Sequence, residues 1–264
     1  MINCGKFTSD QPIMTHKIFV INLDERPDKF KNAEDQLIAQ GLSCERISAI
    51  RGSNLTQEQI EQAYDKEANK KHYMKTMSVG EIGCYMSHRA AWQKIVNENL
   101  DYAIILEDDC KLEADFHVLP SLLDQLKDWD YIKLTGPRGR KKIQATAKIS
   151  SGYSVAHYNK IPISTPGQVV SLKGAKTLLN NSQPFFRPVD VDLQQYWEKK
   201  IDIIGIEPKL VDTAGFDSDI TAMDKASARS VKTKFWPRVK FRATSALNSK
   251  LANNKRPSLE KYIK

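Results

Sequence analysis

The chain has 264 residues, of which 41% are hydrophobic and 27% are charged, a composition typical of a folded globular protein and inconsistent with disorder along the whole length. Its longest apolar runs, residues 18–21 and 102–106, fall far short of the ~20 residues that a membrane-spanning helix needs. The net charge of +8 is compatible with a nucleic-acid, membrane or phosphorylated partner and does not by itself distinguish them.

The first residues of the chain bear on its cellular location, and the cysteines bear on zinc binding and disulfide bonds. Residues 1–11 have no apolar core of signal-peptide length, so we expect the protein to stay in the cytosol. The four cysteines are isolated and form no Cys-x-x-Cys pair, which argues against a structural zinc site and against a disulfide scaffold.

The chain then begins with a β-α-β pattern. Residues 17–23 (KIFVINL) are almost all apolar, as in a strand that is covered on both faces and lies near the centre of a parallel sheet. Apolar residues at helical spacing predict a helix from Phe30 to Gly41, and residues 44–47 predict a second strand. Alternation of this kind indicates an α/β protein.

Two helices are predicted next. Residues 56–71 form a polar helix that begins at Thr56. Residues 78–97 form a better-marked helix, because Ser78 and Glu81 have the spacing of a capping box, in which each side chain satisfies a backbone N–H of the first turn.

A second buried strand, residues 101–106, ends in the three consecutive acids Glu107, Asp108 and Asp109. Like charges this close destabilise one another unless a cation compensates them. Ligands of α/β proteins gather at the carboxyl ends of strands, and carboxylate oxygens suit Mg²⁺ or Mn²⁺ shared with substrate phosphates. The alternative is that the acids only stabilise the positive end of a following helix.

The remaining elements continue the alternation to about residue 210. We expect helices at residues 116–126, 174–180 and 191–200, and short strands at residues 131–134, 169–172 and 203–206. Residues 135–151, with glycines, a proline and a run of cations at 138–142, predict a mobile basic loop that is solvated, contacts an anionic ligand or forms a lid over a bound ligand.

The excess of positive over negative charge lies at the end of the chain. Residues 225–264 contain 12 Lys or Arg and a single acid, Glu260, which leaves residues 1–224 with a net charge of −3. Aromatic residues such as Trp236 and Phe241 lie among these cations, a mixture suited to an anionic lipid surface, where each cation contributes ~1 kcal/mol. We therefore divide the chain into a domain, residues 1–224, and a basic, helical tail, residues 225–264, which either associates with a membrane or packs back on the domain.

Ser87 and His88 lie on the predicted helix that leads into the acidic strand. A lone histidine on a helix is more often a packing residue than a ligand. Its combination with the acidic cluster nevertheless makes His88 a candidate contact for a ligand.

These features together resemble glycosyltransferase family 25, the family of lipopolysaccharide and lipooligosaccharide galactosyltransferases. The matching segments, in the family's order across about residues 17–220, are residues 18–23 with Arg26, residues 80–84 with Ser87 and His88, residues 104–109, Gly174-Ala175, residues 188–190 and residues 208–211. The resemblance covers most of the chain and ends before the basic tail.

The resemblance implies an α/β fold of the GT-A type, which is a Rossmann-like nucleotide-sugar-binding domain with a mostly parallel central sheet. It implies a UDP-sugar donor, UDP-galactose in first place and UDP-glucose in second, with Mn²⁺ or Mg²⁺ as cofactor. The hexose would pass to a lipooligosaccharide or lipopolysaccharide acceptor with inversion at the anomeric carbon. Such an enzyme is expected to be cytoplasmic and peripheral on the inner membrane, held to its anionic surface by the basic tail.

Residue by residue, the resemblance places Asn22, Leu23 and Arg26 beside the nucleotide. His88 would contact the diphosphate or the sugar, and Ser87 would support it by a hydrogen bond.

The acidic cluster takes the place of the family's Asp-x-Asp-like motif. Glu107, Asp108 and Asp109 would together hold the metal and the diphosphate, with Asp109 as the first choice for direct metal contact and Glu107 as a further ligand. Two departures from the family pattern are Lys29, where an arginine is expected after Arg26, and Gln168, where an aromatic residue is expected.

Transfer with inversion needs a base that removes the acceptor proton and a cation that stabilises the leaving diphosphate. The candidates for the base are Asp190 and Asp192, which lie in residues 188–192 (PVDVD) at the start of a predicted helix. Asp190 is the preferred base. It is also a favoured residue for a helix N-cap, and the two roles are compatible.

Two other classes of function remain. A non-catalytic carbohydrate-binding or adhesion-type protein could share the fold, although the intact acidic residues speak against it. A nucleic-acid-binding protein would account for the basic tail, but no recognisable binding module accompanies it, so we expect no nucleic-acid partner.

Overall fold

The computed structural model describes residues 14–137, 143–150, 152–213 and 235–264, and within them the chain forms a central sheet of eight strands. In spatial order these are β2 (Glu45–Ser48), β1 (His16–Asn22), β3 (Tyr102–Glu107), β8 (Gly167–Ser171), β5 (Tyr131–Lys133), β9 (Ile203–Glu207), β7 (Tyr153–Tyr158) and β6 (Ile143–Ser150). A separate two-stranded sheet joins β10 (Val211–Thr213) to β4 (Cys110–Leu112).

The sheet is mixed, so the expectation of a mostly parallel sheet is wrong. The pairs β1–β2, β1–β3 and β5–β9 are parallel, but β8 lies antiparallel between β3 and β5, and the hairpin of β6 and β7 adds antiparallel strands at one edge. The strand predicted at the sheet centre, β1, lies one strand from the opposite edge. Long apolar strands indicate burial on both faces but do not reveal the direction of their neighbours.

The helices follow from the same sequence signals. They are α1 (Pro27–Ile38), α2 (Gln57–Ala63), α3 (Lys66–His72), α4 (Val79–Asn97), α5 (Leu119–Leu123), α6 (Leu172–Asn181), α7 (Val189–Leu193), α8 (Tyr196–Lys199) and α10 (Phe235–Asn253), with short 3₁₀ turns η1 (Gly52–Asn54), η2 (Phe116–Val118) and η4 (Leu259–Tyr262). The capping box at the start of α4 is confirmed, since Ser78 and Glu81 exchange hydrogen bonds with each other's backbone N–H groups.

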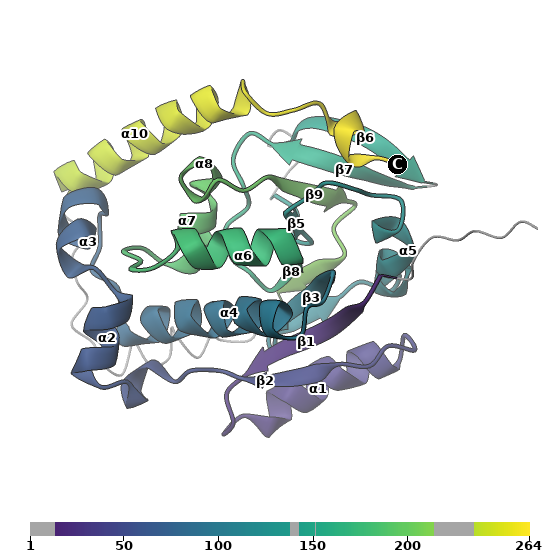
Figure 1. Cartoon of the computed structure of the whole chain (residues 1–264), viewed down its shortest axis with the longest axis horizontal. Helices are drawn as coiled ribbons and strands as arrows, with labels where there is room; N and C mark the ends of the chain where they lie inside the picture. Colours follow the sequence, from purple (N-terminus) through teal and green to yellow (C-terminus); the bar gives the residue numbers. More distant parts are fainter. Residues whose placement is uncertain (1–13, 138–142, 151, 214–234) are drawn as a thin grey trace, which may run out of the picture.

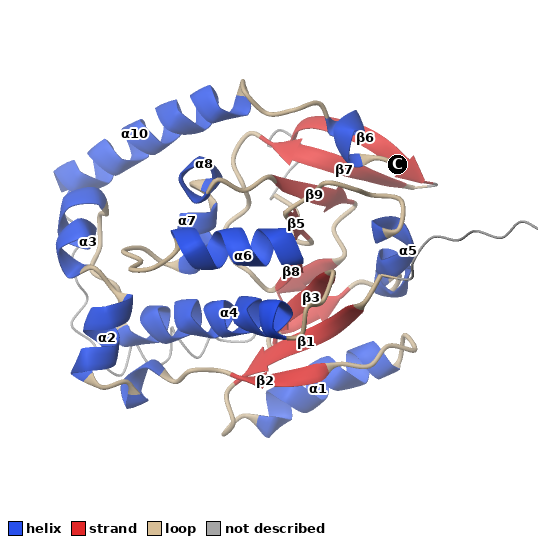
Figure 2. Ribbon diagram, in the orientation of Figure 1, coloured by secondary structure: helices blue, strands red, loops and turns tan. Residues whose placement is uncertain are grey.

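Helices cover both faces of the sheet, as Figures 1 and 2 show. Alternate residues of each strand face opposite sides: Phe19 and Ile21 of β1 pack with α4, α6, α7 and α8, whereas Ile18 and Val20 pack with α1 and α5. The two apolar cores on either side of the sheet confirm the α/β fold. The carboxyl ends of β1 and β3 lie at one edge, beside α4, because the two strands are parallel neighbours.

Several predicted elements are interrupted. The helix expected at residues 56–71 divides into α2 and α3, because Tyr64 is extended and bridges to Phe185, and Asp65 then caps α3. The helix expected at 191–200 divides into α7 and α8. At the break, the side chain of Gln194 donates to the carbonyl of Ile161.

Two further regions differ from expectation. Residues 116–126 form η2 followed by the short helix α5 rather than one helix. Much of the expected loop at 135–151 is strand β6, while its cationic residues 138–142 lie outside the described residues. Apolar and polar residues alternate along β6 (IQATAKIS), none of them is buried, and the strand pairs with the mostly buried strand β7, which begins at Tyr153.

The last residues of the chain pack on the sheet. Tyr262 is 1% exposed and belongs to the same core as α1 and α5, and Ile263 bridges to Leu126. Arg256 donates to the carbonyl of Ile203, and Asn253 of α10 donates to that of Asn159. Figure 1 shows α10 running along one side of the molecule from α3 toward β7. In the described part of the chain, no helix combines the length and the apolar character that crossing a bilayer requires.

Candidate active site

The acidic cluster lies where β3 ends and lines a cleft together with the end of β1. Ile21, Asn22 and Leu23 form one wall of this cleft, and Glu107, Asp108 and Asp109 line it as well. The side-chain amide of Asn22 donates to Asp108 Oδ2 at 2.6 Å and to the carbonyl of Arg26 at 2.8 Å. Asn22 therefore orients Asp108, while its side-chain oxygen Oδ1 is buried and receives no hydrogen bond from any described group.

Asp109 is the least compensated member of the cluster. Burial and the negative charges of Glu107 and Asp108 raise the pKa of Asp109 to about 7, although the cation of Lys29 counteracts them. Its Oδ1 atom is buried, and no described donor reaches it. A carboxylate group in such surroundings gains from a divalent cation with oxygen ligands, so the residues present fit Mg²⁺ or Mn²⁺.

Glu107 has a different environment, because His88 and Thr165 both contact its Oε1. His88 Nε2 lies 3.0 Å from that atom, and the hydroxyl of Thr165 donates to it at 2.5 Å. Burial alone would raise the pKa of Glu107, but these hydrogen bonds and the cation of Lys133 lower it below its usual value. Glu107 is thus held as a carboxylate with one oxygen already bonded.

His88 is buried in the centre of this arrangement. The amide of Gln168 lies 2.9 Å from His88 Nδ1, so a histidine with its proton on Nε2 accepts from Gln168 and donates to Glu107. Both residues are at most 1% exposed. His88 lines the cleft and also acts as a packing and hydrogen-bonding residue, which combines the two expectations for it.

The expectation that Ser87 supports His88 by a hydrogen bond is not met, because its described hydrogen bonds join other partners. Its hydroxyl donates to the carbonyl of Gly83 in the preceding turn and accepts from the backbone N–H of Ile50. Ser87 therefore fixes α4 against the segment before η1, which forms the far wall of the cleft.

Glycines allow this close approach of α4 to η1. A Cβ atom on Gly83 would lie 2.4 Å from the carbonyl oxygen of Ile50, and one on Gly52 would lie 1.7 Å from that of Val79. Neither backbone atom can move aside easily. This close approach accounts in physical terms for Gly83 within the segment 80–84 and for Gly52 opposite it.

Asp190 is the second acidic feature of the site. It lies in the first turn of α7, whose N-cap is Pro188, so Asp190 itself is not the cap. Its Oδ2 accepts from the backbone N–H of Ser164 at 3.1 Å and its Oδ1 from that of Val191 at 2.7 Å. The charges of Glu107 and Asp190 both act on Cys84, Tyr131 and Lys133, so each of these three side chains lies within electrostatic reach of both acids.

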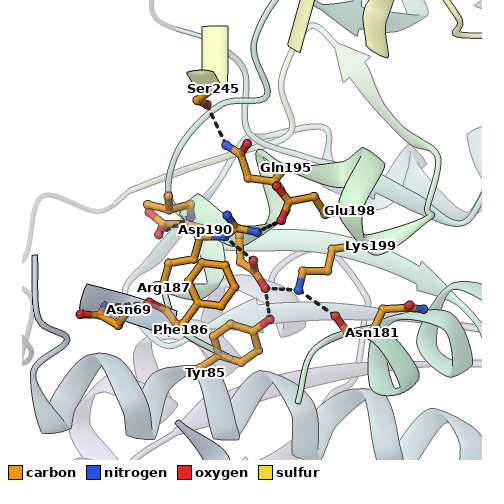
Figure 3. A network of polar contacts seen from close by, with 12 residues as sticks. Asn69, Tyr85, Asn181, Phe186, Arg187, Asp190, Gln195, Glu198, Lys199 and Ser245 are labelled. Carbon is orange, nitrogen blue, oxygen red and sulfur yellow. Dashed lines mark hydrogen bonds and ion pairs between the residues drawn. The ribbon is translucent and has the colours of Figure 1, made fainter. Parts of the chain in front are cut away.

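Asp192 lies in a different environment and is not available as a base. It is 1% exposed, with Arg187 Nε at 2.6 Å from one oxygen and Lys199 Nζ at 2.8 Å from the other. The hydroxyl of Tyr85 also donates to it. Figure 3 shows the side chains of Tyr85, Arg187 and Lys199 close together, and Arg187 also pairs with Glu198. The candidate base is therefore Asp190, and Asp192 is a structural acid.

The other predicted residues take clear positions. Leu23 and Lys29 line the cleft, and the charge of Lys29 acts on Asp109. The guanidinium of Arg26 pairs with Asp28 at the start of α1. Gln168 faces His88 from inside the core, so it does not line the cleft.

A second donor set lies close by. Cys84, His88 and Glu107 each offer one ligand atom, and these atoms lie within 4.8 Å of one another. Burial raises the pKa of the Cys84 thiol well above its usual value, and His88 is already bonded to Glu107. This set is therefore less suited to a cation than the carboxylate oxygens of the acidic cluster.

Sequence reasoning missed Lys133 and Thr165. Lys133 is the charged residue inside the apolar strand β5 and is 1% exposed, an unusual placement that could have marked it. Thr165 lies beside a proline in residues 162–166, and only the folded chain brings its hydroxyl to Glu107.

A family model and a curated relative name the same family. A family model described as glycosyltransferase family 25 (LPS biosynthesis protein) matches residues 15–193. Procollagen galactosyltransferase 1 of Danio rerio is 29% identical over 186 residues, a match that covers 67% of this chain and 30% of that protein. Procollagen galactosyltransferase 2 of Homo sapiens is 29% identical over 187 residues, covering 67% of this chain and 29% of that protein.

Two further matches complete the comparison. A glycosyltransferase 25 family member of Aedes aegypti is 29% identical over 203 residues, which cover 71% of this chain and 31% of that protein. The chain thus spans about a third of the length of these relatives. A solved glycosyltransferase involved in the glycosylation of the major capsid of PBCV-1 matches with a TM-score of 0.40 and 12% identity, over 80% of this chain and 99% of that chain.

Proposed function

The chain belongs to glycosyltransferase family 25, and on this basis we propose that it transfers a hexose from a UDP-sugar to a saccharide acceptor, with inversion at the anomeric carbon. Galactose is the first choice of sugar and glucose the second, and the acceptor is of the lipooligosaccharide or lipopolysaccharide class. In this proposal the fold serves as a GT-A-like nucleotide-sugar-binding domain. The observation that carries it is the buried Asp109 Oδ1, which no described donor reaches, in a cleft that also holds the unbonded side-chain oxygen of Asn22.

Each of these atoms suits a part of the donor. The side-chain oxygen Oδ1 of Asn22 can accept a hydrogen bond from the base or ribose of a nucleotide, and Leu23 provides an apolar wall. Asp109 and Glu107 would hold Mn²⁺ or Mg²⁺, which supplies charge stabilisation of the leaving diphosphate when bound. Lys29 adds a positive charge at the same cleft.

Asp190 is the proposed base. Hydrogen bonds from the backbone N–H groups of Ser164 and Val191 hold one lone pair on each of its oxygens and fix the direction of the others. A carboxylate oriented in this way can take the proton of an acceptor hydroxyl as the hydroxyl oxygen attacks the anomeric carbon. His88 keeps Glu107 ionised and in place and lines the cleft in which the diphosphate or the sugar would lie.

The test is turnover of a panel of UDP-sugars by the full chain with Mn²⁺, Mg²⁺ or EDTA. We expect metal-dependent release of UDP, fastest with UDP-galactose, and a fall of ~100-fold or more in Asp190→Asn at unchanged donor affinity. The exposed acid Asp35, which pairs with Lys31 on α1, provides the matched control Asp35→Asn, for which we expect normal turnover. Absence of turnover and of thermal stabilisation with every UDP-sugar would exclude the proposal.

We further propose that the enzyme is cytoplasmic and peripheral on the inner membrane, with α10 as the contact. The inner side of α10 faces the body, where Ser245 bonds to Gln195 and Ser249 to Asn159. The opposite side exposes Trp236, Val239, Leu247 and Leu251, which are between 43% and 76% exposed. The helix also has four cations and no acid, which is complementary to an anionic lipid surface.

Vesicle sedimentation tests this contact. The full chain should bind vesicles that contain phosphatidylglycerol, bind less at high salt, and not bind pure phosphatidylcholine vesicles. The double variant Leu247→Ser/Leu251→Ser should lose binding, whereas Ile38→Ser, an equally exposed apolar residue on α1, should not. Equal binding by both variants would remove the membrane contact from α10.

A further inference from the structure

Two consecutive residues, Ser164 and Thr165, connect the two halves of the candidate site. The hydroxyl of Thr165 donates to Glu107 Oε1 at 2.5 Å, at the acidic cluster. One residue earlier, the backbone N–H of Ser164 donates to Asp190 Oδ2 at 3.1 Å. The chain passes from the proposed metal-holding acid to the proposed base within a single peptide unit.

Lys133 anchors this link from the sheet. Its side chain is 1% exposed, and its ammonium group donates to the carbonyl oxygen of Ser164. Burial lowers the pKa of Lys133 to about 8, while the charges of Asp190 and Glu107 act in the opposite direction. An ammonium ion in the interior is costly unless acids and hydrogen bonds compensate it, so Lys133 and the two acids form one electrostatic unit.

Ser164 also has a backbone conformation that its surroundings must impose. Its φ angle is +70°, in the left-handed region that residues other than glycine rarely adopt. The contacts on both of its backbone polar groups, from Lys133 and to Asp190, account for this conformation. Strained residues held in this way are found at sites where geometry matters for function.

We propose that Ser164, Thr165 and Lys133 are positioning residues that set the place of Asp190 relative to Glu107. This inference rests on the proposed function, which gives those two acids their roles. The link is short and is bonded at each end, so a change at Thr165 or Lys133 moves the base with respect to the donor. Misplacement by about 1 Å is enough to reduce a transfer rate by roughly 100-fold.

The first arm of the test compares three threonine variants. Thr165→Val removes the hydroxyl that holds Glu107 and should lower kcat roughly tenfold or more, with donor KM changed by less than about threefold. Thr165→Ser keeps the hydroxyl and should restore most of kcat. Thr177→Val removes a hydroxyl whose described hydrogen bond lies within α6, and it should have the kcat and KM of the wild-type protein.

The second arm uses Lys133→Met, which removes the cation at similar length. Asp190 acts electrostatically on four described ionisable groups, which are Lys133 and Tyr131 of β5, Cys84 of α4 and Tyr73 after α3. Among these four groups, Lys133 carries the positive charge. Without it, the carbonyl of Ser164 loses its donor, and kcat should fall roughly tenfold or more while donor KM changes by less than about threefold.

Hydrogen–deuterium exchange gives a readout that does not depend on activity. In Lys133→Met the amide of Ser164 should exchange at least tenfold faster than in the unchanged protein and in Thr177→Val. Unchanged exchange at Ser164, or kcat in Thr165→Val equal to that of Thr177→Val, would overturn the proposal. If the unchanged protein turned over no UDP-sugar, the proposed function would fail, and the exchange measurement would still decide whether Lys133 holds the link.

Discussion

Asp192 and Asp109 are both largely withdrawn from water, yet their surroundings differ in every other respect. Asp192 has Arg187 and Lys199 within 2.8 Å and a hydroxyl from Tyr85, so its charge is compensated inside the protein. Asp109 has two neighbouring acids and a buried oxygen that no described donor reaches. The first arrangement completes the fold, whereas the second leaves charge that a bound cation can compensate.

A third ionisable group, His157 of β7, is neither paired with an opposite charge nor left charged for a ligand. It is 5% exposed beside Arg256, and burial together with that cation lowers its pKa to about 4. The folded protein therefore keeps His157 neutral at physiological pH. The three residues show that an ionisable group can be paired, neutralised or left for a ligand, and each choice has a measurable consequence.

The largest effect is expected from breaking the paired group. Asp192→Asn leaves Lys199 buried without its acid and Arg187 paired with Glu198 alone, and we expect a loss of roughly 3–5 kcal/mol in the free energy of unfolding. Urea titration at pH 7.5 measures this difference. A loss below about 1 kcal/mol would mean that the network in Figure 3 is not tightly coupled.

The uncompensated group should behave in the opposite way. Asp109→Asn removes one of three like charges, so the metal-free protein should be equally stable or more stable at pH 8, since the repulsion is relieved. Metal-dependent turnover should fall roughly 100- to 1,000-fold, because in the proposed function Asp109 would hold the cation that stabilises the leaving diphosphate. Mn²⁺ titration by calorimetry tests the loss of metal binding, and urea titration tests the stability. A variant that is both less stable and fully active would contradict the contrast between Asp109 and Asp192.

Local signals in the sequence were sufficient for much of the fold. The apolar runs that became β1 and β3 and the capping box of α4 depend on neighbours within one or two turns, and these elements form where expected. The insertion of antiparallel β8 between β3 and β5 depends on pairing across more than 30 residues, for which periodicity holds no information. The expected parallel sheet failed for this reason.

The candidate site divides in the same way. Glu107, Asp108 and Asp109 could be identified because three acids after an apolar strand are costly in any fold. Asp190 and Asp192 look alike in sequence, and only the packing of Arg187 and Lys199 separates the structural acid from the candidate base. Lys133 and Thr165 act through contacts with residues more than 25 positions away.

The neutralised group gives a prediction with a defined pH window. The unfolded chain protonates His157 near pH 6.5, whereas the folded protein resists protonation until about pH 4, so acidification favours the unfolded state between these values. The contribution of His157 to stability is therefore complete above pH 6.5 and decreases as the pH falls, by about 3 kcal/mol at pH 4. The difference in stability between the unchanged protein and His157→Gln should shrink over this window in urea titrations, and parallel curves would contradict the assignment.

The smallest effect is expected for charges that are paired in water. Lys31 and Asp35 lie one turn apart on α1, 2.7 Å from each other, with side chains 70% and 55% exposed. Solvent screening and the entropy of two flexible side chains cancel most of their attraction, so Asp35→Asn should change the free energy of unfolding by less than about 0.5 kcal/mol. Urea titration at low and at high salt measures it. A change as large as that of Asp192→Asn would show that solvent exposure does not decide how much an acid contributes, and the contrast between Asp192 and Asp109 would then need another cause.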